Sequence, residues 1–215
     1  MYIKEGDFSR MKCAPWPIAI YDHQSFYVDS STIFQPSIFS GTLDGKPFVG
    51  LGSYDRLCIK GESADFTNVP LGYTTSYMLG IREDGRKELM FISGSFNEDG
   101  KTVAIYYIDG ETPIICDYFT LEADWVHLPY VDDGTCVFTD AVIRFGGKEF
   151  HFHGKWGNKG FTEKPRIEKH GQSQISGTWY EGKIPYRHRL YYSGFENMEA
   201  YDYKLKKMGF SIVDE

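Results

Sequence analysis

The sequence predicts an all-β fold: an antiparallel meander that closes into a barrel, or folds into a two-layer sandwich, and ends in one C-terminal helix. The main observation is a series of acidic–glycine and related pairs between aromatic or β-branched runs, namely Asp44-Gly45, Asp84-Gly85, Asp99-Gly100, Asp109-Gly110, Asp133-Gly134, Gly146-Gly147 and Glu181-Gly182. Such pairs favour tight hairpin turns, because glycine adopts the positive φ that these turns need at no steric cost. The 16 Tyr and 16 Phe residues agree with this prediction, since aromatic rings pack well on pleated strands.

The first 31 residues are predicted to be irregular. Pro15 and Pro17 flank Trp16, and proline lacks the backbone N–H that a helix interior or a central strand requires. We expect residues 1–31 to pack against the barrel as an irregular segment. Residues 32–215 are then predicted to form a single β-domain, a length that one barrel or sandwich accommodates.

Ten short segments beyond this point carry the strand pattern. They are rich in β-branched and aromatic residues, several alternate polar with apolar side chains, and turn signals separate them. The predicted strands are Thr32–Phe39, Lys46–Tyr54, Thr74–Ile81, Glu88–Phe96, Thr102–Ile108, Ile114–Leu121, Cys136–Phe145, Glu149–Lys155, Ile175–Tyr180 and Tyr186–Tyr192.

One helix is predicted near the C-terminus, at about residues 194–208. Ser193-Gly194-Phe195-Glu196 matches a capping box, and apolar residues then recur at helical spacing as far as Met208. Gly209 is the expected end of the helix. A strand is the alternative, because Tyr201, Tyr203 and Leu205 also alternate with charged residues.

Composition and missing motifs exclude several functions. The net charge is −7 and the basic residues are dispersed, which argues against nucleic acid and against anionic membranes as partners. No apolar run approaches the ~18 residues of a membrane span, and the N-terminus lacks the apolar core of a signal peptide, so we expect a cytoplasmic protein with reduced cysteines. The Walker, GxSxG, HExxH and GxGxxG motifs are absent, which argues against ATP, NAD and serine-hydrolase chemistry.

The sequence Glu149-Phe150-His151-Phe152-His153 is the most suggestive local cluster. On a strand, the glutamate and both histidines project to one face and the two phenylalanines to the other. His151 and His153 are therefore candidates for acid–base catalysis or ligand contact. A cupin-like metal site is an alternative, because a His-x-His strand is typical of cupins. However, Gly157 and Asn158 stand where a cupin carboxylate is expected, and the pattern favours a polar, solvent-facing strand face with Phe150 and Phe152 in the core over either functional interpretation.

His188 is the other candidate acid–base group. If the predicted strand is regular, Tyr186, His188, Leu190 and Tyr192 share one face, and Arg187 and Arg189 share the other. With the first face inward, His188 transfers protons inside an apolar cavity that Tyr186 and Tyr192 line. With the reverse register, the two arginines point inward and clamp an anion.

Three further residues complete the predicted ligand site. Asp55 ends a glycine-rich strand and is a candidate base at the mouth of the barrel. Trp156 and Trp179 are candidate stacking surfaces for a flat ligand. The same tryptophans on an open sheet indicate a carbohydrate-binding sandwich as an alternative.

The late strand Gly177-Thr178-Trp179-Tyr180-Glu181-Gly182 resembles strand segments of the calycin (lipocalin-like) barrels. Gly50-Leu51-Gly52-Ser53-Tyr54-Asp55-Arg56 is similar to glycine–aromatic strand ends of the lipocalin-like hydratase and cyclase group. The likeness in pattern extends from about Thr32 to Met208. It implies a lipocalin-like barrel that holds an apolar small molecule and in some members isomerises, hydrates or cyclises it.

The sequence thus predicts a protein that binds a small, largely apolar or aromatic molecule in a β-barrel cavity. If the protein is an enzyme, we expect an isomerase, cyclase or lyase that works by general acid–base chemistry, with no cofactor and no metal. The predicted catalytic residues are His188, His151 and His153, and the predicted ligand-binding residues are Tyr186, Trp156, Trp179, Tyr192 and Asp55. The sequence does not indicate an oligomeric state, and a purely structural protein with a filled interior is the remaining alternative.

Overall fold

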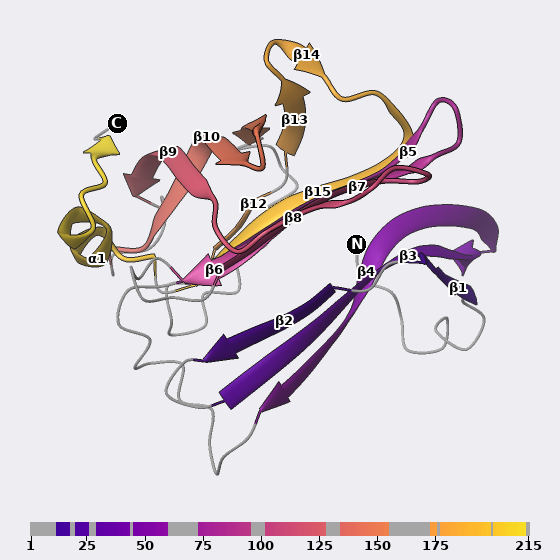
Figure 1. Ribbon diagram of the computed structural model, residues 1–215, viewed down its shortest axis with the longest axis horizontal. Helices are drawn as coiled ribbons and strands as arrows, with labels where there is room; N and C mark the ends of the chain where they lie inside the picture. The colour runs from indigo at the N-terminus through magenta and orange to yellow at the C-terminus, as the bar shows by residue number, and fades with distance from the viewer. Residues whose placement is uncertain are drawn as a thin grey trace.

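The residues of the chain that the structure describes form three β-sheets and one short helix (Figure 1). This computed structural model describes residues 12–17, 20–25, 29–43, 45–59, 73–95, 102–127, 134–154, 173–175, 177–198 and 200–213. Neighbouring strands pair antiparallel, apart from a short parallel pair at the C-terminal end. The predicted all-β class with one C-terminal helix is confirmed.

The N-terminal sheet comprises β1 (Lys12–Pro15), β2 (Ile20–Ser25), β3 (Asp29–Leu43) and β4 (Lys46–Ile59). The prediction that residues 1–31 are irregular is therefore wrong for β1, β2 and the start of β3. Pro15 is tolerated because it ends an edge strand, which pairs with β3 alone. Trp16 follows and is buried, with its backbone N–H donating to the Pro36 carbonyl at 2.8 Å.

The central sheet has the strand order β12-β15-β5-β6-β7-β8. Its strands are β12 (Ser173–Ile175), β15 (His188–Met198), β5 (Tyr73–Arg82), β6 (Lys87–Ser95), β7 (Thr102–Ile108) and β8 (Ile114–Cys116). Hydrophobic side chains are buried on both of its faces. Along β6, Leu89 and Phe91 pack toward the N-terminal sheet, whereas Met90 and Ile92 pack into the larger core on the opposite side.

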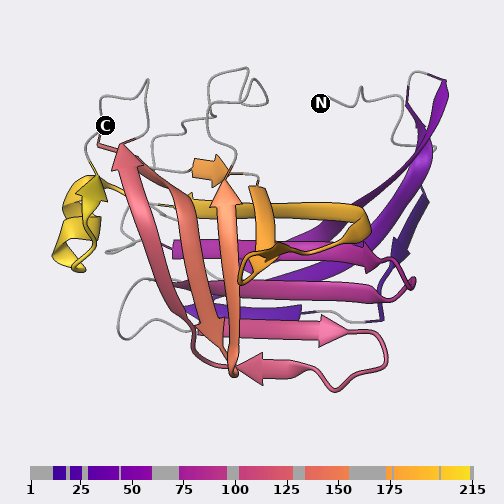
Figure 2. The same cartoon turned by 90° about the horizontal axis from the view of Figure 1, so that it is seen from above.

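The outer sheet covers that opposite side, in the order β14-β13-β11-β10-β9-β16. Its strands are β14 (Ile184–Pro185), β13 (Gly177–Glu181), β11 (Lys148–Gly154), β10 (Cys136–Phe145), β9 (Thr120–His127) and β16 (Ile212–Val213). In Figure 2 the pink and orange strands of this sheet run across the magenta strands of the central sheet. The sequence predicted a single strand over Ile114–Leu121, but β8 and β9 divide this region between two sheets.

No ladder among the described residues closes these sheets into a barrel, so the predicted barrel gives way to stacked layers. The space between the central and outer sheets is filled by fully buried aromatic side chains, which include Trp125, Phe138, Phe150, Phe152, Trp179 and Phe195. The sandwich alternative describes these two layers, and the N-terminal sheet adds a third layer through its own smaller core.

The helix α1 (Asp202–Lys207) is shorter than predicted and begins later. The predicted capping box lies inside β15, where Ser193 pairs with Met78 of β5 and its hydroxyl donates to the Gly177 carbonyl at 2.7 Å. The cross-strand pairing therefore overrides the local cap signal. Gly209 does follow the helix, with a φ of +88°. Within the described residues, no helix is long and apolar enough to cross a membrane.

Candidate functional site

A buried glutamate lies at the centre of the candidate site. Glu88, near the start of β6, has a side chain that is only 2% exposed. Its Oε2 accepts a hydrogen bond from His188 Nε2 at 2.8 Å, and its Oε1 accepts one from the Tyr106 hydroxyl. The guanidinium of Arg82 lies 3.4 Å from the same Oε1. Three strands therefore converge on one carboxylate.

The register of the central sheet explains this convergence. Gly80 of β5 pairs with Glu88 on one side and with Tyr191 of β15 on the other. The ring of His188 extends across Gly80 to reach the carboxylate, and a Cβ at position 80 would lie only 2.0 Å from His188 Cδ2. A glycine at this position is thus required by the close approach of the imidazole.

Electrostatics keep the Glu88 carboxylate ionised. Burial alone would raise its pKa, but the hydrogen bonds from His188 and Tyr106 and the charge of Arg82 outweigh burial and hold the pKa below the usual range. The pKa of Tyr106 is raised by its burial and by its hydrogen bond to the carboxylate. The site therefore presents an anionic acceptor beside a phenol that keeps its proton at neutral pH.

His188 is fixed by two flanking rings. Its imidazole is fully buried and stacks between Tyr186, with ring centroids 6.1 Å apart, and Tyr191, at 5.5 Å. Because a carboxylate only accepts, the proton of the bond to Glu88 belongs to Nε2. The other nitrogen, Nδ1, is buried and has no hydrogen-bond partner within the described part of the chain.

A β-bulge corrects the predicted faces of this strand. The pairing of β15 with β5 shifts register between His188 and Leu190, which moves His188 to the face of Tyr191. Tyr192 consequently lies on the opposite face, where it stacks on Tyr77 at 5.1 Å and its hydroxyl lies 3.1 Å from the Tyr77 hydroxyl. The predicted wall of Tyr186, His188 and Tyr192 therefore divides between two faces.

A cavity of about 340 Å³ opens above Glu88, between the β5–β6 turn and the β13–β14 hairpin. Tyr106 and Glu88 line it from the central sheet, and Ile184, Pro185 and Tyr186 line it from the hairpin. Arg187 also lines it and is exposed, as is Arg189 nearby. His188 lies behind Glu88 rather than in the lining, so it acts on the cavity through the carboxylate.

The predicted alternation of β11 is confirmed. Phe150 and Phe152 are buried in the core, and Glu149, His151 and His153 lie on the outer face of the sheet. His151 Nε2 donates to Glu149 Oε1 at 2.7 Å. These histidines therefore lie on the face of the outer sheet that is turned away from the core, whereas the Glu88 cluster faces the interior.

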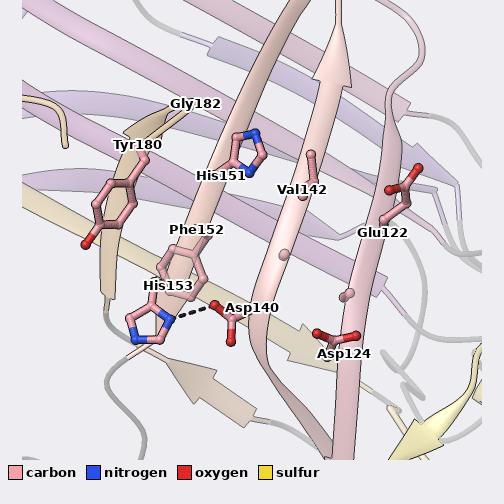
Figure 3. Close-up of a pocket in the computed structure, with 11 residues that line it drawn as sticks. Glu122, Asp124, Asp140, Val142, His151, Phe152, His153, Tyr180 and Gly182 are labelled. Carbon is pink, nitrogen blue, oxygen red and sulfur yellow. Dashed lines mark hydrogen bonds and ion pairs between the residues drawn. The ribbon is translucent and has the colours of Figure 1, made fainter. Parts of the chain in front are cut away.

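A second pocket of about 390 Å³, here called the groove, runs over this outer face (Figure 3). Glu122, Asp124 and Asp140 line it together with His151 and His153, and Figure 3 shows the imidazole of His153 turned toward Asp140. The two atoms concerned, Nδ1 and Oδ1, are 2.6 Å apart. Among the residues that the structure describes, no three His, Cys, Asp or Glu side chains gather closely enough to hold a metal ion, so the cupin-like arrangement is not supported there.

The remaining predicted site residues lie elsewhere. Trp179 is fully buried and packs against Phe152 and Phe195, and it lines neither pocket. Asp55 belongs to the part of β4 for which the backbone alone is described, where it pairs with Phe34. Trp156 lies outside the described residues. A carbohydrate-binding sheet needs exposed tryptophan rings, so the buried Trp179 does not support that alternative.

Sequence reasoning missed Glu88, Tyr106 and Arg82. A signal for the first was present, because Glu88 shares the alternation of Met90 and Ile92 on a strand that is otherwise apolar. A charged residue at an inward strand position is unusual unless it is paired. No comparable signal marks Tyr106 or Arg82.

No protein-family model matches the chain, and no curated protein matches it. Among solved structures, a candidate AttH protein from Nitrosomonas europaea aligns with a TM-score of 0.53 at 11% identity, over 89% of this chain and 61% of that one. Kievitone hydratase from Nectria haematococca aligns with a TM-score of 0.37 at 11% identity, over 86% of this chain and 65% of that one. The chain thus spans less than two thirds of the length of either protein.

The first likeness concerns the fold alone, because the identity is so low. It shows a fold similar to that of the Nitrosomonas structure, so the predicted resemblance to the calycin barrels is supported in part, and no closed barrel forms among the described residues. At its TM-score, the second structure supports no inference about this chain.

Proposed function

We propose that this protein binds a small, largely aromatic molecule in the cavity above Glu88. The observation that carries the proposal is a carboxylate that is almost fully buried yet lines an accessible cavity with aromatic walls. Burying a charge is costly unless it is paired, and three side chains are arranged here to keep this one ionised. Perturbed titratable groups in a cavity are a common mark of a functional site.

If the protein is an enzyme, Glu88 is the proton acceptor of a cofactor-free isomerisation, cyclisation or lyase step. It is ionised at neutral pH, as a general base must be, although its lowered pKa makes it a weaker base than an ordinary carboxylate. The raised pKa of Tyr186, caused first by its burial and then by the charges of Glu181 and Glu88, keeps a second phenol protonated in the lining. His188 and Tyr106 hold the carboxylate in place, so His188 is a positioning residue rather than the predicted catalytic base.

Ligand-observed NMR with a panel of small aromatic compounds tests the binding proposal. We expect several compounds to bind to the wild type and to lose at least tenfold in affinity in Tyr186→Ala, because this substitution removes an aromatic wall of the cavity. The matched control is Asp140→Asn in the groove, which should leave binding unchanged. Binding that depends on Asp140 and not on Tyr186, or no binding to the wild type, would contradict the proposal.

The catalytic part has a separate test. If a ketone binds, Glu88 should remove a proton from the carbon beside the carbonyl, and in D₂O that carbon should take up deuterium from the solvent. Glu88→Gln should abolish this exchange, because an amide is not a base at neutral pH. Binding without exchange in the wild type would indicate a binding protein rather than an enzyme.

A further inference from the structure

The most deeply buried polar group in the described lining of the cavity is the Glu88 carboxylate, which can only accept hydrogen bonds, and the neighbouring Tyr106 hydroxyl already donates its proton to that carboxylate. Glu88 is held ionised, so it has no proton to donate. Its Oε1 accepts a hydrogen bond from Tyr106 and pairs with the guanidinium of Arg82, whereas Oε2 accepts a hydrogen bond from His188 alone among the described residues. Since each carboxylate oxygen has two lone pairs, the carboxylate retains acceptor capacity beside these three partners.

The other charged groups of the lining lie nearer to solvent and largely offset one another. Arg82 is 35% exposed and faces Glu88, and Asp84 is 48% exposed and pairs with Arg86 at 2.8 Å. The rim residues Glu83, Glu181 and Arg187 are exposed, and the effect of such exposed charges is weakened by solvent and salt. The buried carboxylate therefore dominates the choice of head group.

We infer that the ligand of this cavity is a flat ring that carries a hydrogen-bond donor head group, such as an amidine or an amine, and that carboxylate-bearing ligands are rejected. This inference rests on the proposed function. A donor head pairs with the Glu88 carboxylate, while the ring contacts Tyr186 and the hairpin residues Ile184 and Pro185. An anionic head would instead oppose a buried negative charge, which is strongly unfavourable.

Benzamidine, benzamide and benzoate test this inference, because they share ring and size and differ in the charge and donors of the head group. Dissociation constants are measured by NMR titration. We expect benzamidine to bind at least tenfold more tightly than benzoate, with benzamide between them. Glu88→Gln should reduce this preference at least fivefold, because the charge is lost while the shape is kept.

A second variant covers the case in which Glu88→Gln does not fold. Ile184 is 68% exposed on β14, so Ile184→Lys should leave the fold intact and place a cation at the cavity, which should reduce the preference for benzamidine over benzoate several-fold. Asp140→Asn controls for benzamidine bound in the acidic groove and should change nothing.

The outcomes separate the two proposals. Benzoate binding as tightly as benzamidine, or a preference that survives both cavity variants, would overturn the donor inference while aromatic binding stands. If none of the three compounds and no member of the aromatic panel binds to the wild type, the proposed function fails, and the inference fails with it.

Discussion

At the scale of single residues, Gly80 controls the candidate site although it carries no side chain. In Gly80→Ala, the new methyl group would overlap His188, which cannot move aside because Tyr186 and Tyr191 enclose its ring. We expect a loss of about 2 kcal/mol in unfolding free energy, as for other overpacked positions, and displacement of the imidazole from Glu88. Urea denaturation and the NMR signals of the His188 ring measure these effects.

Gly50→Ala is the matched control for this substitution. A Cβ at Gly50, also a strand glycine, meets no atom within 4 Å, so the change in stability should stay within about 0.5 kcal/mol. Equal stability of the two variants would show that His188 does not depend on Gly80 for its position.

The Glu88 carboxylate should also make the fold sensitive to acid. Its folded-state pKa lies below the ordinary value of 4.5, so the stabilisation is fully present above that value and is lost as the pH falls through the lower folded-state pKa. We expect the wild type to lose more stability than Glu88→Gln between neutral pH and about pH 3. Urea midpoints across this range measure the difference, and parallel curves for the two proteins would contradict the role given to Glu88.

At the scale of elements, short sequence patterns predicted the turns and strands whose conformation depends only on neighbouring residues. The glycines of the predicted turns at positions 45, 85, 110, 134, 146, 147 and 182 all have positive φ. This agreement follows because a turn needs only a few adjacent residues to adopt its conformation. Strands such as β7 and β10 match their predicted bounds for the same reason, since their alternation and flanking turns lie within one short segment.

Features that depend on distant partners could not be predicted. The bulge at the start of β15 arises from pairing with β5, which lies about a hundred residues earlier, and it reverses the face of His188 relative to Tyr192. The capping box at Ser193 was misread for the same reason, because strand pairing decides the conformation there. Within the candidate site, His188 and Tyr186 could be predicted from their residue types. Arg82 and Tyr106 could not, because strand register alone brings them to Glu88.

At the scale of the whole molecule, the central sheet separates two hydrophobic cores that support different parts of the structure. The larger core, between the central and outer sheets, supports the Glu88 cluster, and the smaller core attaches the N-terminal sheet to the opposite face. Phe34 anchors this attachment: it is 3% exposed and its ring lies 4.7 Å from that of Phe91 and 5.7 Å from that of Tyr77. The site and the anchor are thus on opposite faces of one sheet.

This arrangement predicts that the N-terminal sheet can be loosened without loss of the cavity. Phe34→Ala should cost about 3 kcal/mol of stability, as expected for a buried phenylalanine, and speed hydrogen exchange of β1–β4 amides, while benzamidine affinity stays within about twofold, a change of ~0.4 kcal/mol. Phe152→Ala is the matched control in the larger core, where the ring contacts Trp179 and Phe195. It should cost a similar amount but also weaken ligand binding, because it disturbs the layer that carries the hairpin. If Phe34→Ala weakens binding as much as Phe152→Ala, the two cores act as one, and the N-terminal sheet must be counted as part of the site.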